Sequence, residues 1–397
     1  MVSAIPSCCR AGASEVFDYS NHGDAQFRNK TYSKSAGYDS IAPDASELNS
    51  DSFFWVASCT KLIGTIAVLQ YVERGQISLD KHVERILPEL ANLDIIKPFR
   101  SSDDPGNPRF TLEPSTKKIT LRQLLCHTSG LSYDTGNPLI AAWRVSRQME
   151  LLAFSGKVVD AYVTPLLFEL GEGWAYSGGT DLACEVVTRL NKISLEQYMR
   201  KHIFGPLGIS STTFRLELYP ELKHRLVKMT KRTESGVLAE SIKMWPDNAL
   251  EDCGGVGLYS TSNDYARVLE NLLKDKPTIL RPETVGLMFA PQLQRGSFAM
   301  RDLHNSRIAR AMTGVAEPND AINFGLGSMY MQEDVGNYKK DFLVWGGLPN
   351  LYWFACRAHG IAGFYASQVT PPGDSKSVRL AQEFFRHVYQ LKEMQSM

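Results

Sequence analysis

Residues 53–71, FFWVASCTKLIGTIAVLQY, join a strand-like run directly to a helical run. Ser58 lies at the junction, and Lys61 follows it one helical turn later. A serine hydroxyl is a poor nucleophile at neutral pH, and an amine held beside it can take its proton or tune the group that does. Free N–H groups at the start of the helix also stabilise developing negative charge. The stretch therefore predicts Ser58 as an acyl carrier; a helix-capping serine with a solvated lysine is the alternative.

A second Ser-x-x-Lys sequence spans residues 115–118, directly after Pro114. No apolar periodicity in this polar stretch would hold the two side chains on one face. We therefore predict no catalytic role for it.

Composition limits the class of protein. The chain has 397 residues and is 43% hydrophobic, which supports a sizeable core, and its 43 Lys and Arg balance its 43 Asp and Glu. This balance argues against binding to nucleic acid or to an anionic membrane. Residues 1–15 lack the features of a signal peptide, and no apolar run is long enough to span a bilayer. We expect a cytoplasmic protein.

Cysteine and histidine form no metal-binding pattern. The seven cysteines have no metal-ligand spacing, and the eight histidines include no H-E-x-x-H sequence. Four cysteines in apolar surroundings are expected in the core, as free thiols of a reducing compartment: Cys59, Cys126, Cys184 and Cys356. We expect catalysis without a metal or another cofactor.

Strand patterns concentrate at the two ends of the chain. Glu15–Tyr19 and a segment toward Tyr38 flank a predicted hairpin turn at residues 21–24. Three strands and an amphipathic helix are expected near the C-terminus: Asp341–Trp345, Leu351–Arg357, Ile361–Ser367 and Ser375–Met394. The middle of the chain has more helical patterns. The simplest architecture is one antiparallel sheet built from both ends, with a helical insertion between them.

Two polar stretches, Pro98–Lys118 and Arg295–Asp320, are expected as surface loops. Loops of this kind can shape access to a cleft, although they are also common places for harmless insertions.

A serine nucleophile needs a base, and Tyr176 is the candidate. It lies in WAYSGG, residues 174–179, beside a flexible glycine pair. An ammonium near a phenol favours the deprotonated form, so Tyr176 beside Lys61 could take the proton of Ser58. A tyrosine packed in a turn is the alternative.

The nucleophile also needs an oxyanion hole, and the strand LVWGGL, residues 343–348, is the candidate. Its interior pair, Gly346 and Gly347, indicates close approach by a ligand or another segment, or else a β-bulge. The backbone N–H of Gly347 or Leu348 could form the hole together with that of Ser58.

These residues, in this order, resemble a known family. Four motifs follow the order found in serine β-lactamase-like esterases and class C β-lactamases: SCTK at 58–61, LLCHTSGL at 124–131, YSG at 176–178 and WGG at 345–347. Residues 119–133 and 204–214 also look like this family, so the resemblance covers most of the chain. It is closest to fungal polyketide acyltransferases (transesterases) of the lovastatin acyltransferase type, in which a Gly-rich stretch also ends in Pro-Asn, as at residues 349–350 here.

The resemblance implies a serine β-lactamase-like fold of the α+β class. Residues 1–78 and 255–397 would form a three-layer α/β/α subdomain around an antiparallel sheet from both chain ends. Residues 79–254 would form a mainly helical subdomain within the same catalytic unit. The family usually begins with a long helix, for which the 14 residues before Glu15 leave too little chain.

The resemblance also implies roles for individual residues. Ser58 would be the acylated nucleophile, Lys61 its partner, and Tyr176 the general base that later activates the acceptor hydroxyl. Backbone N–H groups of Ser58 and Leu348 would hold the oxyanion. The motif that contains His127 and Ser129 would be more structural than catalytic.

Departures from the family pattern narrow the substrate. WGG supplies no cation where penicillin-directed enzymes commonly have Lys-Thr-Gly, so β-lactam hydrolysis is not the expected main activity. Gly178 replaces an asparagine that could grip an amide substrate. Two tryptophans favour an apolar pocket for a hydrophobic ester or polyketide, although buried tryptophans are more often plain core. The expected pocket residues are Trp345, Gly346, Gly347, Trp174, Ser177 and Gly178.

Three functions remain open. The first is an acyltransferase that moves an acyl group from a thioester or ester through Ser58 to a hydroxyl of a hydrophobic secondary metabolite, with a donor that an acyl carrier domain could carry. The second is an esterase or lactonase, with water as acceptor; the difference depends on how well the cleft excludes water. The third is a family member that binds or rearranges a metabolite without acylation, against which the intact Ser58, Lys61 and Tyr176 argue.

Overall fold

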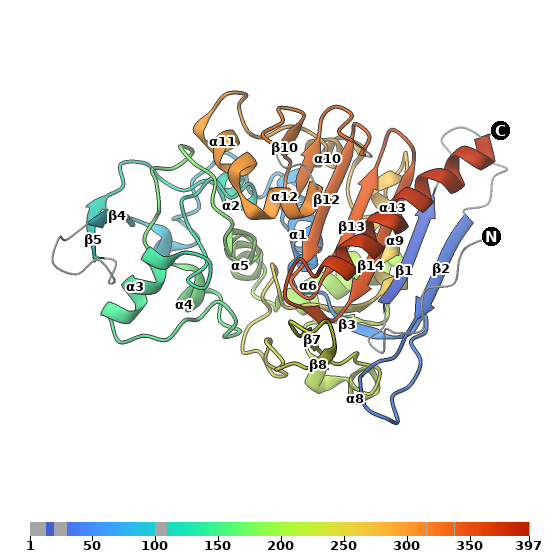
Figure 1. The fold of residues 1–397 in the computed structure, drawn as a ribbon. Coiled ribbons are helices and arrows are strands. Elements are labelled where there is room, and N and C mark those ends of the chain that lie inside the picture. Colours follow the sequence, from blue (N-terminus) through green and yellow to red (C-terminus); the bar gives the residue numbers. More distant parts are fainter. Residues whose placement is uncertain (1–12, 20–29, 100–108, 314–316, 337, 397) are drawn as a thin grey trace.

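A seven-stranded antiparallel sheet organises the computed structural model, which describes residues 13–19, 30–99, 109–313, 317–336 and 338–396 (Figure 1). In spatial order its strands are β10 (Ile322–Phe324), β11 (Met329–Met331), β12 (Phe342–Gly347), β13 (Leu351–Cys356), β14 (Ile361–Ser367), β1 (Ala13–Tyr19) and β2 (Lys30–Ala36). The first two strands of the chain extend the sheet formed by β10 to β14. The predicted sheet from both chain ends is thus confirmed, and the hairpin turn predicted at residues 21–24 lies outside the described residues.

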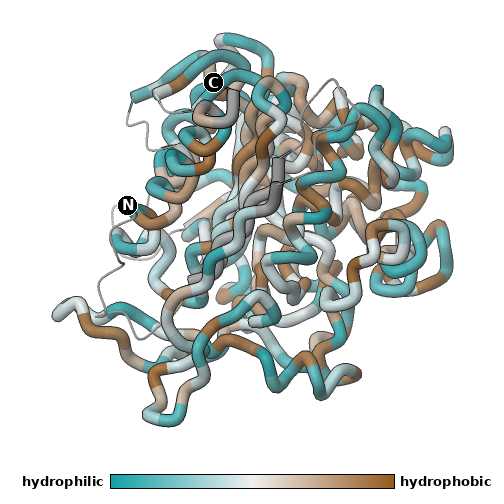
Figure 2. The backbone as a smooth tube through the Cα atoms, turned by 90° about the vertical axis from the view of Figure 1, so that its right-hand side faces the viewer, coloured by the Kyte–Doolittle hydropathy of each residue, from teal (hydrophilic) through white to brown (hydrophobic). Residues whose placement is uncertain are grey.

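Helices cover both faces of this sheet. On one face, Phe385 of α13 (Ser375–Ser396) packs on Phe354 of β13, with ring centroids 4.5 Å apart. On the other, Tyr265 of α9 (Ser262–Leu273) stacks on Phe364 of β14 at 4.2 Å. Figure 1 shows α13 in front of the sheet and α9 behind it, and Figure 2 shows the alternation of hydrophilic and hydrophobic residues along the C-terminal helix. The three-layer arrangement is therefore as predicted.

The segment between the two parts of the sheet is rich in short helices. The longest helices here are α1 (Thr60–Glu73) and α5 (Gly179–Asn191), which pack against each other. Shorter helices of this segment include α2 (Leu121–Leu125), α3 (Pro138–Ser146), α4 (Val159–Tyr162), α6 (Leu195–Met199), α7 (Gly205–Leu207), α8 (Pro220–Lys223) and α10 (Pro282–Met288). Its short strands include β3 (Phe53–Trp55), β6 (Thr212–Thr213), β7 (Thr230–Arg232), β8 (Leu238–Glu240) and β9 (Tyr259–Thr261). After β14, the chain adds β15 (Val369–Thr370), which pairs in parallel with β7.

Both stretches predicted as loops contain regular structure. Within Pro98–Lys118, β5 (Arg109–Pro114) pairs antiparallel with β4 (Asp94–Phe99). Within Arg295–Asp320, the chain forms α11 (Phe298–Asn305) and α12 (Arg307–Thr313). The loop prediction was wrong for Arg295–Asp320, because helices of seven and eight residues are too short to give a clear period.

Candidate active site

Ser58 lies at a sharp strand-to-helix junction. β3 runs into one 3-10 turn, Ala57–Cys59, which leads directly into α1. Ala57 has φ 46°, a left-handed conformation that residues with a side chain rarely adopt. The turn is held from outside, because the Tyr265 hydroxyl donates a 2.8 Å hydrogen bond to the carbonyl of Cys59. The junction predicted from the sequence is therefore present, with Ser58 partly exposed at its tip.

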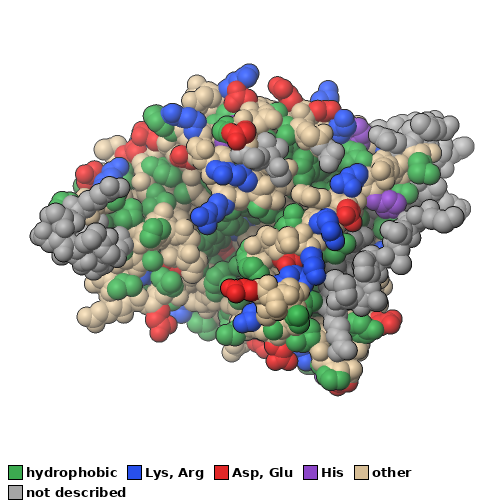
Figure 3. Space-filling view, in the orientation of Figure 1, with side chains coloured by type: hydrophobic (Ala, Val, Ile, Leu, Met, Phe, Trp, Pro, Cys, Tyr) green, Lys and Arg blue, Asp and Glu red, His purple; other side chains and the backbone are tan. Residues whose placement is uncertain are grey.

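Ser58 opens into a cavity of about 500 Å³. Tyr133, Tyr176, Gly346 and Gly347 share its wall with the serine. The rest of the wall is mainly apolar and includes Phe154, Val256, Ile308, Ala311, Met312, Trp345, Leu348 and Tyr352. Figure 3 shows a hollow near the middle of the molecule, with hydrophobic side chains in it and Lys or Arg side chains along its upper rim, where Figure 1 places α12. A cavity of this size and lining suits a hydrophobic small molecule.

Lys61 is completely buried below this cavity. Its Nζ donates hydrogen bonds to the carbonyl of Gly255 at 2.9 Å and to the hydroxyl of Tyr133 at 3.0 Å. It also lies 4.8 Å from the ring centroid of Tyr176. A buried ammonium is tolerated only when oxygens or an aromatic face replace its water, and here both do. Lys61 is thus held at a fixed position one turn after Ser58.

Tyr176, the candidate base, lines the same cavity as Ser58. Its ring packs against His127 and Trp345, with centroids 4.9 Å and 5.2 Å away. Its hydroxyl is buried and has no hydrogen-bond partner in the described part of the chain. Buried polar groups in proteins are nearly always paired, so an unpaired hydroxyl on a cavity wall marks a place for a substrate or a proton.

Tyr133 is a site residue that the sequence did not reveal. Its hydroxyl, rather than that of Tyr176, accepts the hydrogen bond of Lys61. Burial is the largest of the causes that raise the pKa of Tyr133 well above its ordinary value, so this residue stays a neutral phenol. Tyr133 ends the family-like stretch 119–133, but nothing in that stretch indicates that its side chain meets a lysine 72 positions earlier.

Asp181 is the second residue that the sequence missed. It is fully buried in the first turn of α5, and its Oδ1 accepts a 2.8 Å hydrogen bond from the N–H of Gly255. The carbonyl of the same Gly255 accepts from Lys61, so one residue connects the two charges. Burial raises the pKa of Asp181 to about 6, against the opposing effects of Lys61 and the Gly255 N–H. An acidic residue in a first helical turn usually indicates only helix stabilisation, which hides this role.

The glycine strand approaches the Ser58 segment closely. A Cβ on Gly347 would lie 2.6 Å from the carbonyl oxygen of Val56, so β12 can reach this position only without a side chain. The N–H of Leu348 has no acceptor in the described part of the chain. The following turn is fixed by Asn350, whose Nδ2 donates to the carbonyls of Val369 and Pro371 at 2.7 Å and 2.9 Å. The close approach indicated by the glycine pair is therefore between two parts of this chain.

His127 and Ser129 are buried and do not line the cavity. His127 Nδ1 is 3.2 Å from the Ser177 hydroxyl, and its carbonyl accepts from the N–H of Ala175. Burial, with a smaller contribution from Lys61, lowers the pKa of His127 well below 6.5, so the ring is neutral. These contacts join the 124–131 and 174–178 segments, as a structural motif would.

Three of the expected pocket residues lie behind the cavity wall. Trp174 packs on His127 and Phe324, with ring centroids 5.9 Å and 5.7 Å away, and Ser177 is enclosed beside His127. A Cβ on Gly178 would lie 2.3 Å from the ring of Tyr162, which therefore fills the space of the absent asparagine. Trp345, Gly346 and Gly347 line the cavity as expected, whereas Trp174, Ser177 and Gly178 do not.

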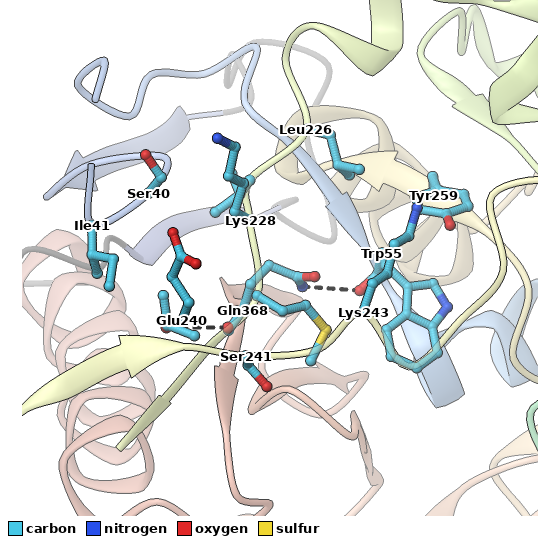
Figure 4. Close-up of a pocket in the computed structure, with 13 residues that line it drawn as sticks. Ser40, Ile41, Trp55, Leu226, Lys228, Glu240, Ser241, Lys243, Tyr259 and Gln368 are labelled. Carbon is cyan, nitrogen blue, oxygen red and sulfur yellow. Dashed lines mark hydrogen bonds between the residues drawn. The ribbon is translucent and has the colours of Figure 1, made fainter. Parts of the chain in front are cut away.

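A second cavity, of about 250 Å³, lies beside Trp55 (Figure 4). Lys228, Glu240 and Lys243 line it, and Gln368 donates a 3.0 Å hydrogen bond to the carbonyl of Trp55. Burial, with a smaller contribution from Lys223, lowers the pKa of Lys243 to about 8. Neither Ser58 nor Tyr176 lines this cavity, so the candidate catalytic residues belong to the larger of the two.

The described residues contain no group of three or more His, Cys, Asp or Glu side chains placed to hold a metal ion. They also contain no helix long and apolar enough to cross a membrane.

Residues 27–385 match the family model described as Beta-lactamase. The chain is 38% identical over 357 residues to acyltransferase calJ of Penicillium decumbens, covering 89% of this chain and 84% of the relative. It is 33% identical over 345 residues to lovastatin esterase of Penicillium rubens, covering 85% and 84%. Among solved structures, the LovD6 mutant of simvastatin synthase from Aspergillus terreus superimposes with a TM-score of 0.83 at 31% identity, covering 97% of this chain and 91% of that one.

Proposed function

The chain belongs to the beta-lactamase family, and on this basis we propose that it is a serine acyltransferase that acylates a hydroxyl of a hydrophobic secondary metabolite. The observation that carries the proposal is the joining of Ser58, Tyr176 and an apolar wall in one cavity of about 500 Å³. The acyl donor is a thioester or an ester, including one that an acyl carrier domain presents at the open mouth beside α12. Five described cysteines are free thiols, which supports a reducing compartment such as the cytoplasm.

In the first half-reaction, the Ser58 hydroxyl attacks the carbonyl carbon of the donor. Tyr176 Oη, which has no hydrogen-bond partner in the described part of the chain, acts as a phenolate that Lys61 beside the ring stabilises. It takes the hydroxyl proton and becomes a neutral phenol. The backbone N–H groups of Ser58 and Leu348 hold the oxyanion. Collapse of the tetrahedral intermediate breaks the bond to the thiol or alcohol, which leaves with the proton, and Ser58 keeps the acyl group.

In the second half-reaction, the hydroxyl of the acceptor gives its proton to Tyr176 Oη and attacks the acyl-enzyme. The new ester leaves, and the proton returns to the Ser58 oxygen. Burial of Tyr133 as a neutral phenol leaves Tyr176 as the tyrosine that exchanges protons. Tyr133 holds Lys61 in place through its 3.0 Å hydrogen bond.

The second candidate is an esterase, in which water replaces the acceptor hydroxyl. The 33% identity to lovastatin esterase over most of both chains favours keeping it, since both reactions share the acyl-enzyme. The apolar wall of the cavity favours transfer, because it lowers the local concentration of competing water.

Intact-protein mass spectrometry tests the proposal and separates the candidates. The protein is mixed with short acyl thioesters and p-nitrophenyl esters, beside the variant Ser58→Ala. We expect a mass gain equal to one acyl group that requires Ser58 and that decays faster with a hydrophobic alcohol than in water. Decay indifferent to the alcohol would identify the hydrolase, and labelling that persists in Ser58→Ala would refute the acyl-enzyme.

A further inference from the structure

In the described part of the chain, one of the residues that line the catalytic cavity has a charged side chain. Among the described residues that form it, Arg307 is the one ionisable group of permanent charge, and the others are apolar, aromatic or neutral polar. Arg307 is exposed, which places its guanidinium at the mouth of the cavity rather than in its depth. The cavity therefore has a positively charged mouth and a mainly apolar interior.

Arg307 reaches this position through the face that α12 turns toward the cavity. The four lining residues of the helix are Arg307, Ile308, Ala311 and Met312, at a spacing that forms one helical face. Met312 anchors the far end of that face, since its Cε would lie only 3.1 Å from a Cβ on Gly346 of β12. About 7.5 Å of helix axis separates Met312 from Arg307. The apolar part of the face thus lies over the glycine strand, and the cation lies toward the opening.

The guanidinium of Arg307 is free to bind a ligand. It makes no hydrogen bond, ion pair or aromatic contact with any described residue, whereas its two neighbours are engaged. Arg310 donates to the carbonyl of Asn305 at 3.0 Å, and Arg301 lies 4.1 Å from the ring centroid of Phe298. A planar guanidinium binds an oxyanion through two parallel hydrogen bonds, which makes arginine suited to carboxylate and phosphate groups.

We propose that Arg307 is an anion subsite of the cavity and that it binds a carboxylate carried by the hydrophobic acceptor. The inference rests on the proposed function and deepens it by naming a second chemical feature of the substrate. The acceptor lies with its apolar body against Ile308 and Met312, its hydroxyl near Ser58, and its carboxylate at the mouth. A phosphate on the arm of a carrier-bound or coenzyme A donor offers the same chemistry, so the test includes both sources.

Binding is measured by calorimetry on Ser58→Ala, so that no turnover is needed. The probes are 10-hydroxydecanoate and its methyl ester for the acceptor, and 4′-phosphopantetheine and pantetheine for the donor arm. We expect the acid to bind about 10-fold tighter than the ester, as for one charge-assisted hydrogen bond at a partly exposed site. Addition of Arg307→Gln removes this margin. Addition of Arg310→Gln, the matched control three residues along the same helix, keeps it.

Three results would overturn the inference. In the first, the acid and the ester bind equally tightly to the Ser58→Ala parent. In the second, Arg310→Gln removes the difference in affinity as fully as Arg307→Gln does, which would indicate an effect of general surface charge. Alternatively, Arg307→Gln removes the preference for phosphopantetheine over pantetheine and leaves the acid margin intact, which assigns the subsite to the donor. Labelling of Ser58 by p-nitrophenyl esters is read separately on the protein with Ser58 intact, so failure of the proposed function is distinguishable from failure of the subsite.

Discussion

The buried carboxyl of Asp181 provides a quantitative test of the site electrostatics. Its pKa is raised to about 6 in the folded protein, against 3.8 as its ordinary value, with burial as the main cause. A group with a raised folded pKa binds its proton more tightly in the folded state than in the unfolded state. Its contribution to stability is therefore fully present below the unfolded pKa and is lost as the pH rises through the folded pKa.

The magnitude follows from the difference between these two values. Since one pKa unit corresponds to about 1.4 kcal/mol, ionisation of Asp181 lowers the free energy of unfolding by about 3 kcal/mol in all, of which about 2.5 kcal/mol is lost between pH 4 and pH 7. Asp181→Asn keeps an acceptor for the Gly255 N–H but cannot ionise. The difference in unfolding free energy between this variant and the parent should therefore change by about 2.5 kcal/mol in favour of the variant over that range.

Urea unfolding at half-unit pH intervals from 4 to 8 measures this difference. Comparison at each pH cancels the titrating groups that do not interact with Asp181. The groups around Asp181 are Lys61, Tyr133, Tyr162, Cys184 and Cys253, and burial raises the pKa of the two phenols and the two thiols well above their ordinary values, so these four do not titrate in this range. Asp44→Asn, which removes an exposed carboxyl, is the control and should follow the parent. A difference that stays constant with pH would show that the Asp181 carboxyl is not desolvated as the structure places it.

Three further predictions concern the tyrosines and the glycine of the middle motif. Tyr176→Phe should slow acyl transfer by about 10³-fold while unfolding is little affected, because the lost hydroxyl has no hydrogen bond; stopped-flow acylation and urea unfolding measure the two effects. Tyr133→Phe removes one of the two oxygens that hold Lys61 and should cost about 10-fold in the same assay; a larger loss than in Tyr176→Phe would make Tyr133 the base. Gly178→Asn, which restores the family asparagine, should destabilise the protein by about 2–3 kcal/mol through collision with the Tyr162 ring, and the added change Tyr162→Ala should relieve the collision; an unchanged urea midpoint in the single variant would contradict the packing described.

The parts of the fold that could be predicted are those with a long local period. β14 begins and ends where its pattern predicts, at Ile361 and Ser367, and α13 begins at Ser375 as expected. Alternation and a 3.6-residue repeat are properties of the segment itself, so they can be recognised from its sequence without knowledge of the residues that pack against it. α12 could not be predicted this way, because its seven residues make fewer than two full turns and the helix packs on β12, which is distant in sequence.

The residues of the site also differ in whether the sequence alone could predict their contacts. Ser58 and Lys61 are neighbours on one helical turn, so a sequence motif can place them together. The partners of Lys61 cannot be placed so, since Tyr133 and Gly255 are 72 and 194 positions away. Closeness in sequence can also give a wrong prediction of the pocket. Trp174 and Gly178 are each two residues from Tyr176, yet of these three residues the tyrosine alone lines the cavity.

The buried polar groups around Lys61 lower the stability of the folded protein, and this indicates that they serve the function of the site. An ammonium, a carboxyl with one unpaired oxygen and an unpaired phenol are buried within one connected group: Lys61, Asp181 and Tyr176. Burial of such groups opposes folding, and hydrophobic replacements of similar size are often neutral or stabilising. A core shaped by stability alone would therefore not retain all three. Tyr176 is the one of the three that lines the cavity of Ser58, while Lys61 and Asp181 are buried behind it. The unpaired hydroxyl of Tyr176 can therefore be completed by the substrate during acyl transfer, and a partner supplied at that moment lowers the barrier rather than stabilises the resting fold.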